Sequence, residues 1–183
     1  MKFNKIYQSQ IDDHHDGMIH REAVRAVILS KEKILLVQSS KRDYKFPGGG
    51  IEEKESHSEA LLREIKEETG YIHGSVKEKI GIIVERKLDE YEKGKVFQMT
   101  SHYYLCELTN QEAVAQQLDP YETELAFMPE WVSLEEAIRQ NERLIKQGEQ
   151  NSWLKRETFV LNEINTLVVK CKCLTPHFAK VLT

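Results

Sequence analysis

One short segment brings Arg63 close to three carboxylates, Glu64, Glu67 and Glu68. In a helix, residues three or four positions apart share a face, with Cβ atoms about 5–6 Å apart. The three carboxylates would therefore point the same way and repel one another. A divalent cation relieves such repulsion, and carboxylate oxygens suit Mg²⁺ or Mn²⁺. The absence of His and Cys from this set argues against zinc.

A simpler interpretation of these residues stays open. Glutamate is a strong helix former, and a glutamate-rich stretch can be a solvated helix face with no ligand. Both interpretations require a helix, and the sequence predicts one from about Ser56 to Thr69. Ser56 and Glu59 form a capping box, and Gly70 suits the position just after a helix end. Its buried side would be formed by Leu61, Leu62 and Ile65.

The segment before this helix, residues 41–50, is predicted to be a loop. It contains Pro47 followed by Gly48, Gly49 and Gly50, which do not fit inside a regular element. Glycines let a backbone turn tightly and approach a metal ion or a phosphate group. The loop could therefore contribute main-chain atoms to a site at the helix.

Strands are expected on both sides of this loop and helix. The hydrophobic pattern predicts strands over residues 22–30, 33–40, 76–88, 96–108 and 126–132. A polar turn at Lys93 and Gly94 would join the two long strands, and Pro129 places the last strand at an edge. Residues 109–125 are predicted to be a loop.

Two further helices are predicted after the last strand. Ser133 and Glu136 form a second capping box, which opens a helix that ends near Gly148. A final helix from Asn151 carries apolar residues at helical spacing. The order of elements favours an α/β or α+β sandwich, in which helices pack on a mixed sheet.

The segment from Gly49 to Tyr71 fits the pattern G-x5-E-x7-R-E-U-x-E-E-x-G-U, where U is a bulky apolar residue. This pattern resembles the box of the Nudix hydrolases, the family that includes the MutT-like enzymes. Its fixed positions are Gly49, Glu55, Arg63, Glu64, Glu67, Glu68 and Gly70. Tyr71 stands where an aliphatic residue is more usual. The resemblance covers roughly residues 20–140.

The resemblance implies a Nudix-like α/β/α sandwich with a mixed β-sheet and a C-terminal helical extension. Residues 1–19 would be an N-terminal extension, and residues 20–148 the hydrolase domain. Residues 149–183 would be a helical extension that packs on the domain or forms a homodimer interface.

The resemblance also implies site residues and a cofactor. Carried over by position, the metal ligands are Glu64, Glu67, Glu68 and the carbonyl of Gly48. Glu55 and Gly49 would support them, and Arg63 would hold a glutamate in place. The expected cofactor is Mg²⁺, with Mn²⁺ as a substitute.

The implied reaction is hydrolysis of a phosphoanhydride bond in a nucleoside diphosphate linked to another group X. The substrate could be a nucleoside triphosphate, a nucleotide sugar or an ADP-ribose type molecule. The general base could be Glu67 or a glutamate of the later loop, Glu122 or Glu124, although these two could equally be solvated loop acids. Glu64 and Arg63 complete the expected catalytic set.

The candidate substrate-binding residues lie in the loop and on the first predicted strand. Arg25, Lys41, Arg42 and Lys45 could contact phosphates, and Tyr44 or Phe46 could stack on a base. In the alternative interpretation, Phe46 belongs to the core and the basic residues are solvated.

Composition narrows the classes of partner. The formal net charge is -4, which gives no broad basic surface for a nucleic acid polymer. No stretch approaches the roughly 18 apolar residues that a membrane span needs. Three cysteines, Cys106, Cys171 and Cys173, are an odd number and favour a reducing cytoplasm over a disulfide framework.

Two other functions stay open beside hydrolysis. Some Nudix-like domains are non-catalytic modules that sense a nucleotide or another ligand, usually with a degraded box, whereas the box here is intact. A Nudix-like isomerase would need further catalytic residues, which the sequence does not identify.

Overall fold

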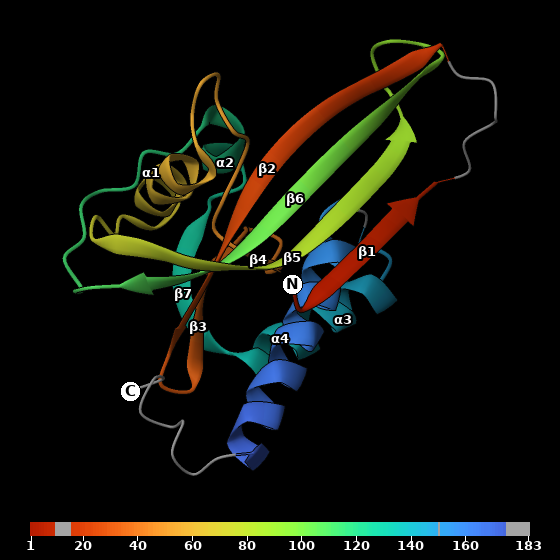
Figure 1. Cartoon of the computed structure of the whole chain (residues 1–183). Helices are drawn as coiled ribbons and strands as arrows, with labels where there is room; N and C mark the ends of the chain where they lie inside the picture. The colour runs from red at the N-terminus through yellow and green to blue at the C-terminus, as the bar shows by residue number, and fades with distance from the viewer. Residues whose placement is uncertain (10–15, 150, 175–183) are drawn as a thin grey trace.

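The computed structural model describes residues 1–9, 16–149 and 151–174, and it contains one mixed sheet between helices (Figure 1). The strands in sheet order are β1 (Phe3–Gln8), β5 (Gly74–Leu88), β6 (Lys95–Leu108), β2 (Gly17–Ser30), β3 (Lys33–Gln38) and β4 (Tyr44–Lys45). A further strand, β7 (Met128–Ser133), pairs with β3. The pairs β1–β5 and β2–β6 are parallel, and the others are antiparallel.

The two long strands form the predicted hairpin. β5 and β6 pair along almost their whole length, and Gly94 in the turn has a φ of 85°, which favours glycine. β2 pairs with β6 over its length but with β3 only next to the turn between them. The loop after β4 runs beside β2, where the amide of Val24 donates to Gly49 O at 3.0 Å. This contact brings the glycine loop against the sheet.

The helix α1 (His57–Thr69) covers one face of the sheet and matches its predicted bounds, whereas Leu62, predicted on its buried side, is exposed. The Ser56 hydroxyl caps the amide of Glu59, and the Glu59 carboxylate accepts from the amide of Ser56 at 2.9 Å. Gly70 ends the helix in the left-handed conformation, with a φ of 81°. Its buried side packs on β2, β3 and β6 in a cluster of Val24, Ala26, Ile28, Leu35, Ala60, Leu61, Ile65 and Cys106.

The helices α3 (Leu134–Lys146) and α4 (Leu154–Leu174) lie on the other face (Figure 1). Val160, Leu161 and Ile164 of α4 are buried with Leu134 and Ala137 of α3 in a second core cluster. That cluster also contains Phe3, Val27, Tyr103 and Phe46. The fold is therefore the predicted α/β/α sandwich with a mixed sheet.

The structure differs from the sequence-based prediction at several places. β1 was not expected. β2 begins at Gly17, five residues before the predicted start, because its first part is mostly exposed and has no continuous apolar pattern that would indicate a strand. A short helix, α2 (Pro120–Glu124), lies inside the predicted loop 109–125. Asp119 followed by Glu122 is a capping signal that could have indicated it. At α3, the Ser133 hydroxyl caps the amide of Glu136.

The last helix begins at Leu154, three residues after the predicted start, and continues to Leu174. In the sequence, His14, His15 and Asp16 form a group that could bind a metal ion or could simply be an exposed segment; His14 and His15 lie outside the described residues. None of the described helices is both long and apolar enough to cross a membrane.

Candidate active site

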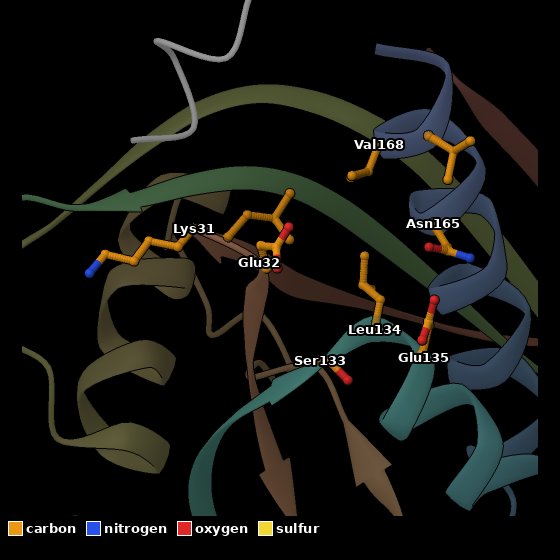
Figure 2. Close-up of a pocket in the computed structure, with 9 residues that line it drawn as sticks. Lys31, Glu32, Ser133, Leu134, Glu135, Asn165 and Val168 are labelled. Carbon is orange, nitrogen blue, oxygen red and sulfur yellow. The ribbon is translucent and has the colours of Figure 1, made fainter. Parts of the chain in front are cut away.

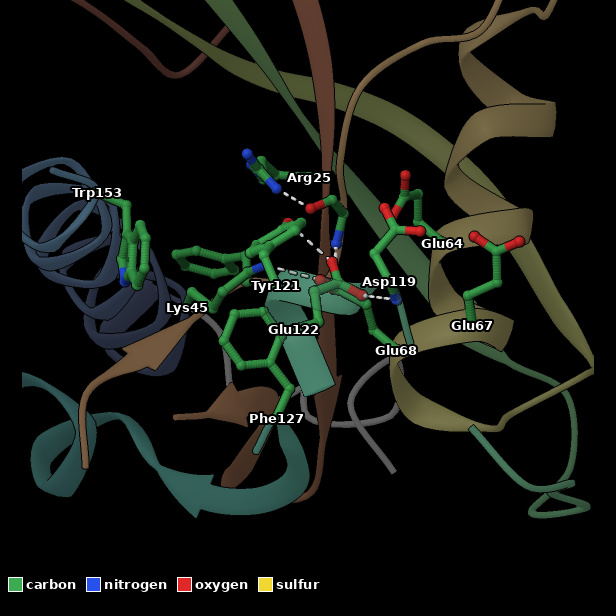
Figure 3. A network of polar contacts seen from close by, with 12 residues as sticks. Arg25, Lys45, Glu64, Glu67, Glu68, Asp119, Tyr121, Glu122, Phe127 and Trp153 are labelled. Carbon is green, nitrogen blue, oxygen red and sulfur yellow. Dashed lines mark hydrogen bonds and ion pairs between the residues drawn. The ribbon is translucent and has the colours of Figure 1, made fainter. Parts of the chain in front are cut away.

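Glu64, Glu67 and Glu68, called here the carboxylate cluster, come from one face of α1 (Figure 3). Their surroundings differ greatly. The side chain of Glu67 is 33% exposed, that of Glu64 is 10% exposed, and that of Glu68 is fully buried. The three carboxylates of this helix thus differ in exposure, from partly exposed Glu67 to fully buried Glu68.

Arg63 ties the cluster to the loop before α1. Its Nη1 donates to Glu64 Oε1 at 2.8 Å and to Glu67 Oε2 at 3.1 Å. Its Nε and Nη2 donate to both oxygens of Glu55, each at 2.8 Å, and Nη2 also donates to Gly50 O at 3.0 Å. Charge-assisted bonds of this kind hold both partners firmly. They raise the pKa of Arg63 and keep the pKa of Glu55 below its usual value.

These bonds leave one oxygen available on each of two glutamates. Within the described part of the chain, no hydrogen bond or ion pair reaches Glu64 Oε2 or Glu67 Oε1. Gly49 lies so close to the carboxylate of Glu64 that a side chain at this position would displace it. Two available carboxylate oxygens beside a main-chain loop fit Mg²⁺ or Mn²⁺, which bind through oxygen.

Glu68 has a different set of contacts. Its Oε1 accepts from Lys45 Nζ at 2.7 Å, and its Oε2 accepts from the amide of Gly48 at 2.7 Å. Lys45 Nζ also lies 4.3 Å from the centre of the Phe127 ring. Both oxygens of Glu68 thus fix the loop, unlike the two available oxygens of Glu64 and Glu67.

The protonation of Glu68 gives a test of its environment. Burial, with the neighbouring charges of Glu122 and Glu64, raises the pKa of Glu68 to about 7 against the opposing effect of Lys45. Between pH 4.5 and 7 the folded state therefore binds more protons than the unfolded chain, so the contribution of Glu68 to stability falls as the pH rises.

We expect this loss to amount to about 2 kcal/mol over that range in metal-free protein. Urea unfolding at a series of pH values, with EDTA present, measures it as the difference in slope between wild type and Glu68→Gln. Parallel curves for the two proteins would contradict the raised pKa.

The carbonyl of Gly48 points toward Arg25 of β2. Gly48 has a φ of 140°, and a Cβ atom there would lie 2.1 Å from Val24 O, so only glycine fits. Arg25 Nη1 donates to Gly48 O, and the guanidinium is buried with its Nε unpartnered among the described residues. A carbonyl oxygen has two lone pairs, so Gly48 O can accept a second partner. Arg25 thus forms a wall of the site.

The two later glutamates proposed as bases are placed differently by α2. Glu122 is buried beside the cluster, where its Oε1 accepts from Tyr121 Oη at 2.8 Å and its Oε2 from the amide of Asp119 at 3.0 Å (Figure 3). Glu124, at the end of α2, is exposed. The structure therefore brings Glu122 to the cluster and gives no contact that would place Glu124 there.

Three residues expected to recognise substrate have other surroundings. Phe46 is fully buried and packs edge-on against Tyr103, with ring centroids 5.5 Å apart. Tyr44 is also buried, and its Oη donates to Glu130 at 2.9 Å. Arg42 is exposed in a turn with a φ of 71°. This geometry does not fit base stacking by either aromatic ring.

The loop that carries Gly48 is anchored by α3 and α4. Asn141 of α3 bonds both main-chain groups of Tyr44, each at 2.9 Å. Glu157 of α4 accepts from the amide of Phe46 at 3.1 Å, and Trp153 Nε1 donates to Asp43. The sequence gives no signal for these contacts, because the residues lie about a hundred positions from the loop and belong to no motif.

Hollows in the described part of the chain also lie outside the carboxylate cluster, and two of them are larger or better enclosed by several elements. One, of about 250 Å³, is bounded by the turn after β2, the start of α3 and the later half of α4 (Figure 2). The other, of about 430 Å³, lies between β1, β5, β6 and the start of α4, with Tyr7, Phe97 and Arg156 in its lining. Neither hollow includes a residue of the cluster.

The sequence of this chain is similar to those of several known proteins. A model described as the NUDIX domain matches residues 19–154. A protein of Bacillus subtilis (strain 168), described as a putative 8-oxo-dGTP diphosphatase YtkD, is 55% identical over 38 residues, which are 21% of this chain and 24% of that protein. A probable DHNTP pyrophosphohydrolase of Lactococcus lactis subsp. cremoris (strain MG1363) is 27% identical over 107 residues, which are 57% of this chain and 64% of that protein.

The chain thus spans about a quarter of one curated relative and just under two thirds of the other. Among solved structures, a C. elegans Ap4A hydrolase in a binary complex has a TM-score of 0.52 and 18% identity. The match covers 82% of this chain and 98% of that one. At 18% identity, this similarity shows a shared fold and nothing more.

Proposed function

Since the chain belongs to the Nudix family, we propose that it is a divalent-metal-dependent hydrolase of phosphoanhydride bonds in nucleoside diphosphate derivatives. The observation that carries this proposal is the pair of available oxygens on Glu64 and Glu67, held in place by Arg63 beside the Gly48 carbonyl. A solvated helix face would not need an arginine that bonds three glutamates and the loop together.

The donor set fits a hard divalent ion. Glu64 Oε2, Glu67 Oε1 and the second lone pair of Gly48 O would hold Mg²⁺ or Mn²⁺, with water as the remaining ligands. Glu68 would support the site by fixing the Gly48 amide rather than through an available oxygen. When bound, the ion would offset phosphate charge and lower the pKa of a bound water.

The protein's own groups supply the rest of the chemistry. Glu67 is the most exposed carboxylate of the cluster, and we assign to it the acceptance of the proton from the attacking water. Arg63 keeps Glu64 and Glu67 in one orientation, so that neither side chain has to be ordered during the reaction. Burial raises the pKa of Glu64, which the charges of Arg63, Arg25 and Lys45 oppose, and these cations favour its ionised form.

The relatives suggest where to look first for the substrate. One is described as a diphosphatase of 8-oxo-dGTP and the other as a pyrophosphohydrolase of DHNTP. We therefore propose a nucleoside triphosphate or a similar triphosphate as the substrate class, with nucleotide sugars and ADP-ribose as the neighbouring classes to be compared. The group X and the base preference are open to direct measurement.

We expect phosphate or pyrophosphate release from one class in a panel of triphosphates, nucleotide sugars, ADP-ribose and dinucleoside polyphosphates. Activity should require Mg²⁺ or Mn²⁺, disappear with EDTA and return when the ion is restored, because the cations of the site, Arg25, Lys45 and Arg63, are already bonded to Gly48 O and to the glutamates. Turnover that persists unchanged in EDTA would contradict the proposed metal dependence. Ligand binding without turnover across the panel would instead favour a sensing module.

A further inference from the structure

A second group of potential metal ligands lies away from the carboxylate cluster. It consists of Glu22 on β2, His57 at the start of α1 and His102 on β6, called here the histidine cluster. β2 and β6 pair in parallel, with Val24 opposite His102, so Glu22 and His102 lie near each other on the face that α1 covers. The fold thus brings together three residues from three separate elements.

The distances between the side-chain atoms suit coordination of a single ion. Glu22 Oε1 lies 3.2 Å from His102 Nε2, and Glu22 Oε2 lies 3.7 Å from His57 Nε2. One ligand atom from each residue can be chosen so that all three lie within 4.8 Å of one another. In a tetrahedral site with bonds of about 2.1 Å, neighbouring ligand atoms are about 3.4 Å apart. The two Glu22 separations, one from each of its oxygens, lie on either side of this value.

Two contacts support a ligand at this place. Tyr104 Oη lies 2.8 Å from His57 Nδ1, which orients the ring so that Nε2 faces Glu22. Metal-bound histidines commonly have such a partner on the other ring nitrogen. The His57 Nε2 to Glu22 distance is too long for a good hydrogen bond, and an ion pair at this distance requires a protonated imidazole, whose charge a bound ion would replace.

His102 presents its Nε2 to Glu22 from β6. Its side chain is 8% exposed, and within the described residues its Nδ1 is buried with no hydrogen-bond partner. The contact with Glu22 uses Nε2, the nitrogen that would bind the ion, so the unpartnered Nδ1 lies on the opposite side of the ring. Burial lowers the pKa of His102, which favours the neutral imidazole that binds metals. Glu22 is 56% exposed, so an ion and water can enter from its side.

We propose that Glu22, His57 and His102 form a binding site for Zn²⁺ that is separate from the carboxylate cluster. Two imidazoles and one carboxylate are ligands that Zn²⁺ accepts and Mg²⁺ does not prefer. His57 precedes Glu67 by ten positions on α1, which corresponds to about 15 Å along the helix axis. The two sites therefore hold different ions at different parts of α1.

Two nearby positive charges limit the strength of the site. Lys79 lies beside Tyr104, with its Nζ 5.9 Å from the ring centre, and its charge acts on His102. The N-terminal end of α1 carries a partial positive charge, which also opposes a cation. With three protein ligands and these charges, the site should bind Zn²⁺ more weakly than a closed site with four protein ligands. Water would complete the coordination.

The test uses the full chain with Mg²⁺ in large excess, so that the carboxylate cluster is occupied. Co²⁺ serves as a spectroscopic probe and Zn²⁺ is measured by calorimetry. Cys171→Ser and Cys173→Ser are introduced in every protein, because thiols also bind these ions. We expect one equivalent bound, with affinity reduced at least about tenfold by His57→Gln or Glu22→Gln.

His73→Gln is the matched control, because His73 Nε2 also lies 3.2 Å from a glutamate, Glu112, in an exposed pair outside the histidine cluster. Its affinity for both ions should equal that of the parent protein. Equal loss in all the variants, or no binding in the parent protein, overturns the proposal. Both test positions, Glu22 and His57, are partly exposed, so these variants should fold, and circular dichroism verifies this.

Discussion

Replacing Glu67 by glutamine should reduce kcat/KM for the hydrolysed substrate by about 10³-fold, because the change removes both a proton acceptor and a charged metal ligand. Glutamine keeps the size of the side chain and can still accept the bond from Arg63. The melting temperature should therefore change little. Initial rates at saturating Mg²⁺, beside metal titrations of the same preparation, measure the effect.

The matched control is Glu53→Gln in the loop before α1. The side chain of Glu53 is 90% exposed and its ion pair with Lys54 is a distant one of 4.0 Å, so its charge should matter little. We expect kcat/KM within about twofold of wild type for this variant. If both variants lose activity equally, the acidic surface as a whole, rather than Glu67, is responsible. If neither loses activity, the assignment of the site is wrong.

The second large effect is expected at Glu157, far along the chain from the carboxylate cluster. This fully buried carboxylate bonds the amide of Phe46 and pairs with Arg156, which also pairs with Glu85. Glu157→Ala should lower the free energy of unfolding by about 3–5 kcal/mol, because it leaves a buried cation poorly compensated. Urea denaturation measures this loss.

Two further proteins separate the possible causes. Glu163→Ala removes a glutamate of the same helix that is only partly buried, and should cost less than about 1 kcal/mol. The double variant Arg156→Met, Glu157→Leu should recover part of the loss, because apolar residues of similar size often replace a buried ion pair well. A stability of Glu157→Ala close to that of wild type would show that α4 does not anchor the loop.

The parts of the fold that could be predicted from the sequence depend on short-range patterns. The capping box at Ser56 and Glu59 and the left-handed Gly70 place α1 almost residue by residue. The turn at Gly94 likewise defines the β5–β6 hairpin. β1 was missed because a strand that alternates buried and exposed residues over only six positions looks like an ordinary polar segment until its partner, β5, is known.

For the candidate site too, short-range spacing could be predicted from the sequence, whereas contacts between distant elements could not. Spacing along one helix shows that Glu64, Glu67 and Glu68 share a face, but not that Glu68 is buried while Glu67 reaches solvent. That difference depends on Lys45 and Phe127, which approach from other elements. The histidine cluster was not visible either, because its residues come from three elements whose pairing is a property of the folded sheet.

Both ends of the described chain contribute to one core. Phe3 of β1 lies against Tyr103, with ring centroids 5.7 Å apart, and it covers Gly81, where even a Cβ atom would collide with its ring. Val160, Leu161 and Ile164 of α4 close the same cluster. During synthesis on the ribosome, a nascent chain that already contains the whole of α1 still exposes this apolar surface. The last helix has to emerge before the core can close, so the interval before its emergence is when the chain is most prone to bind chaperones or to aggregate.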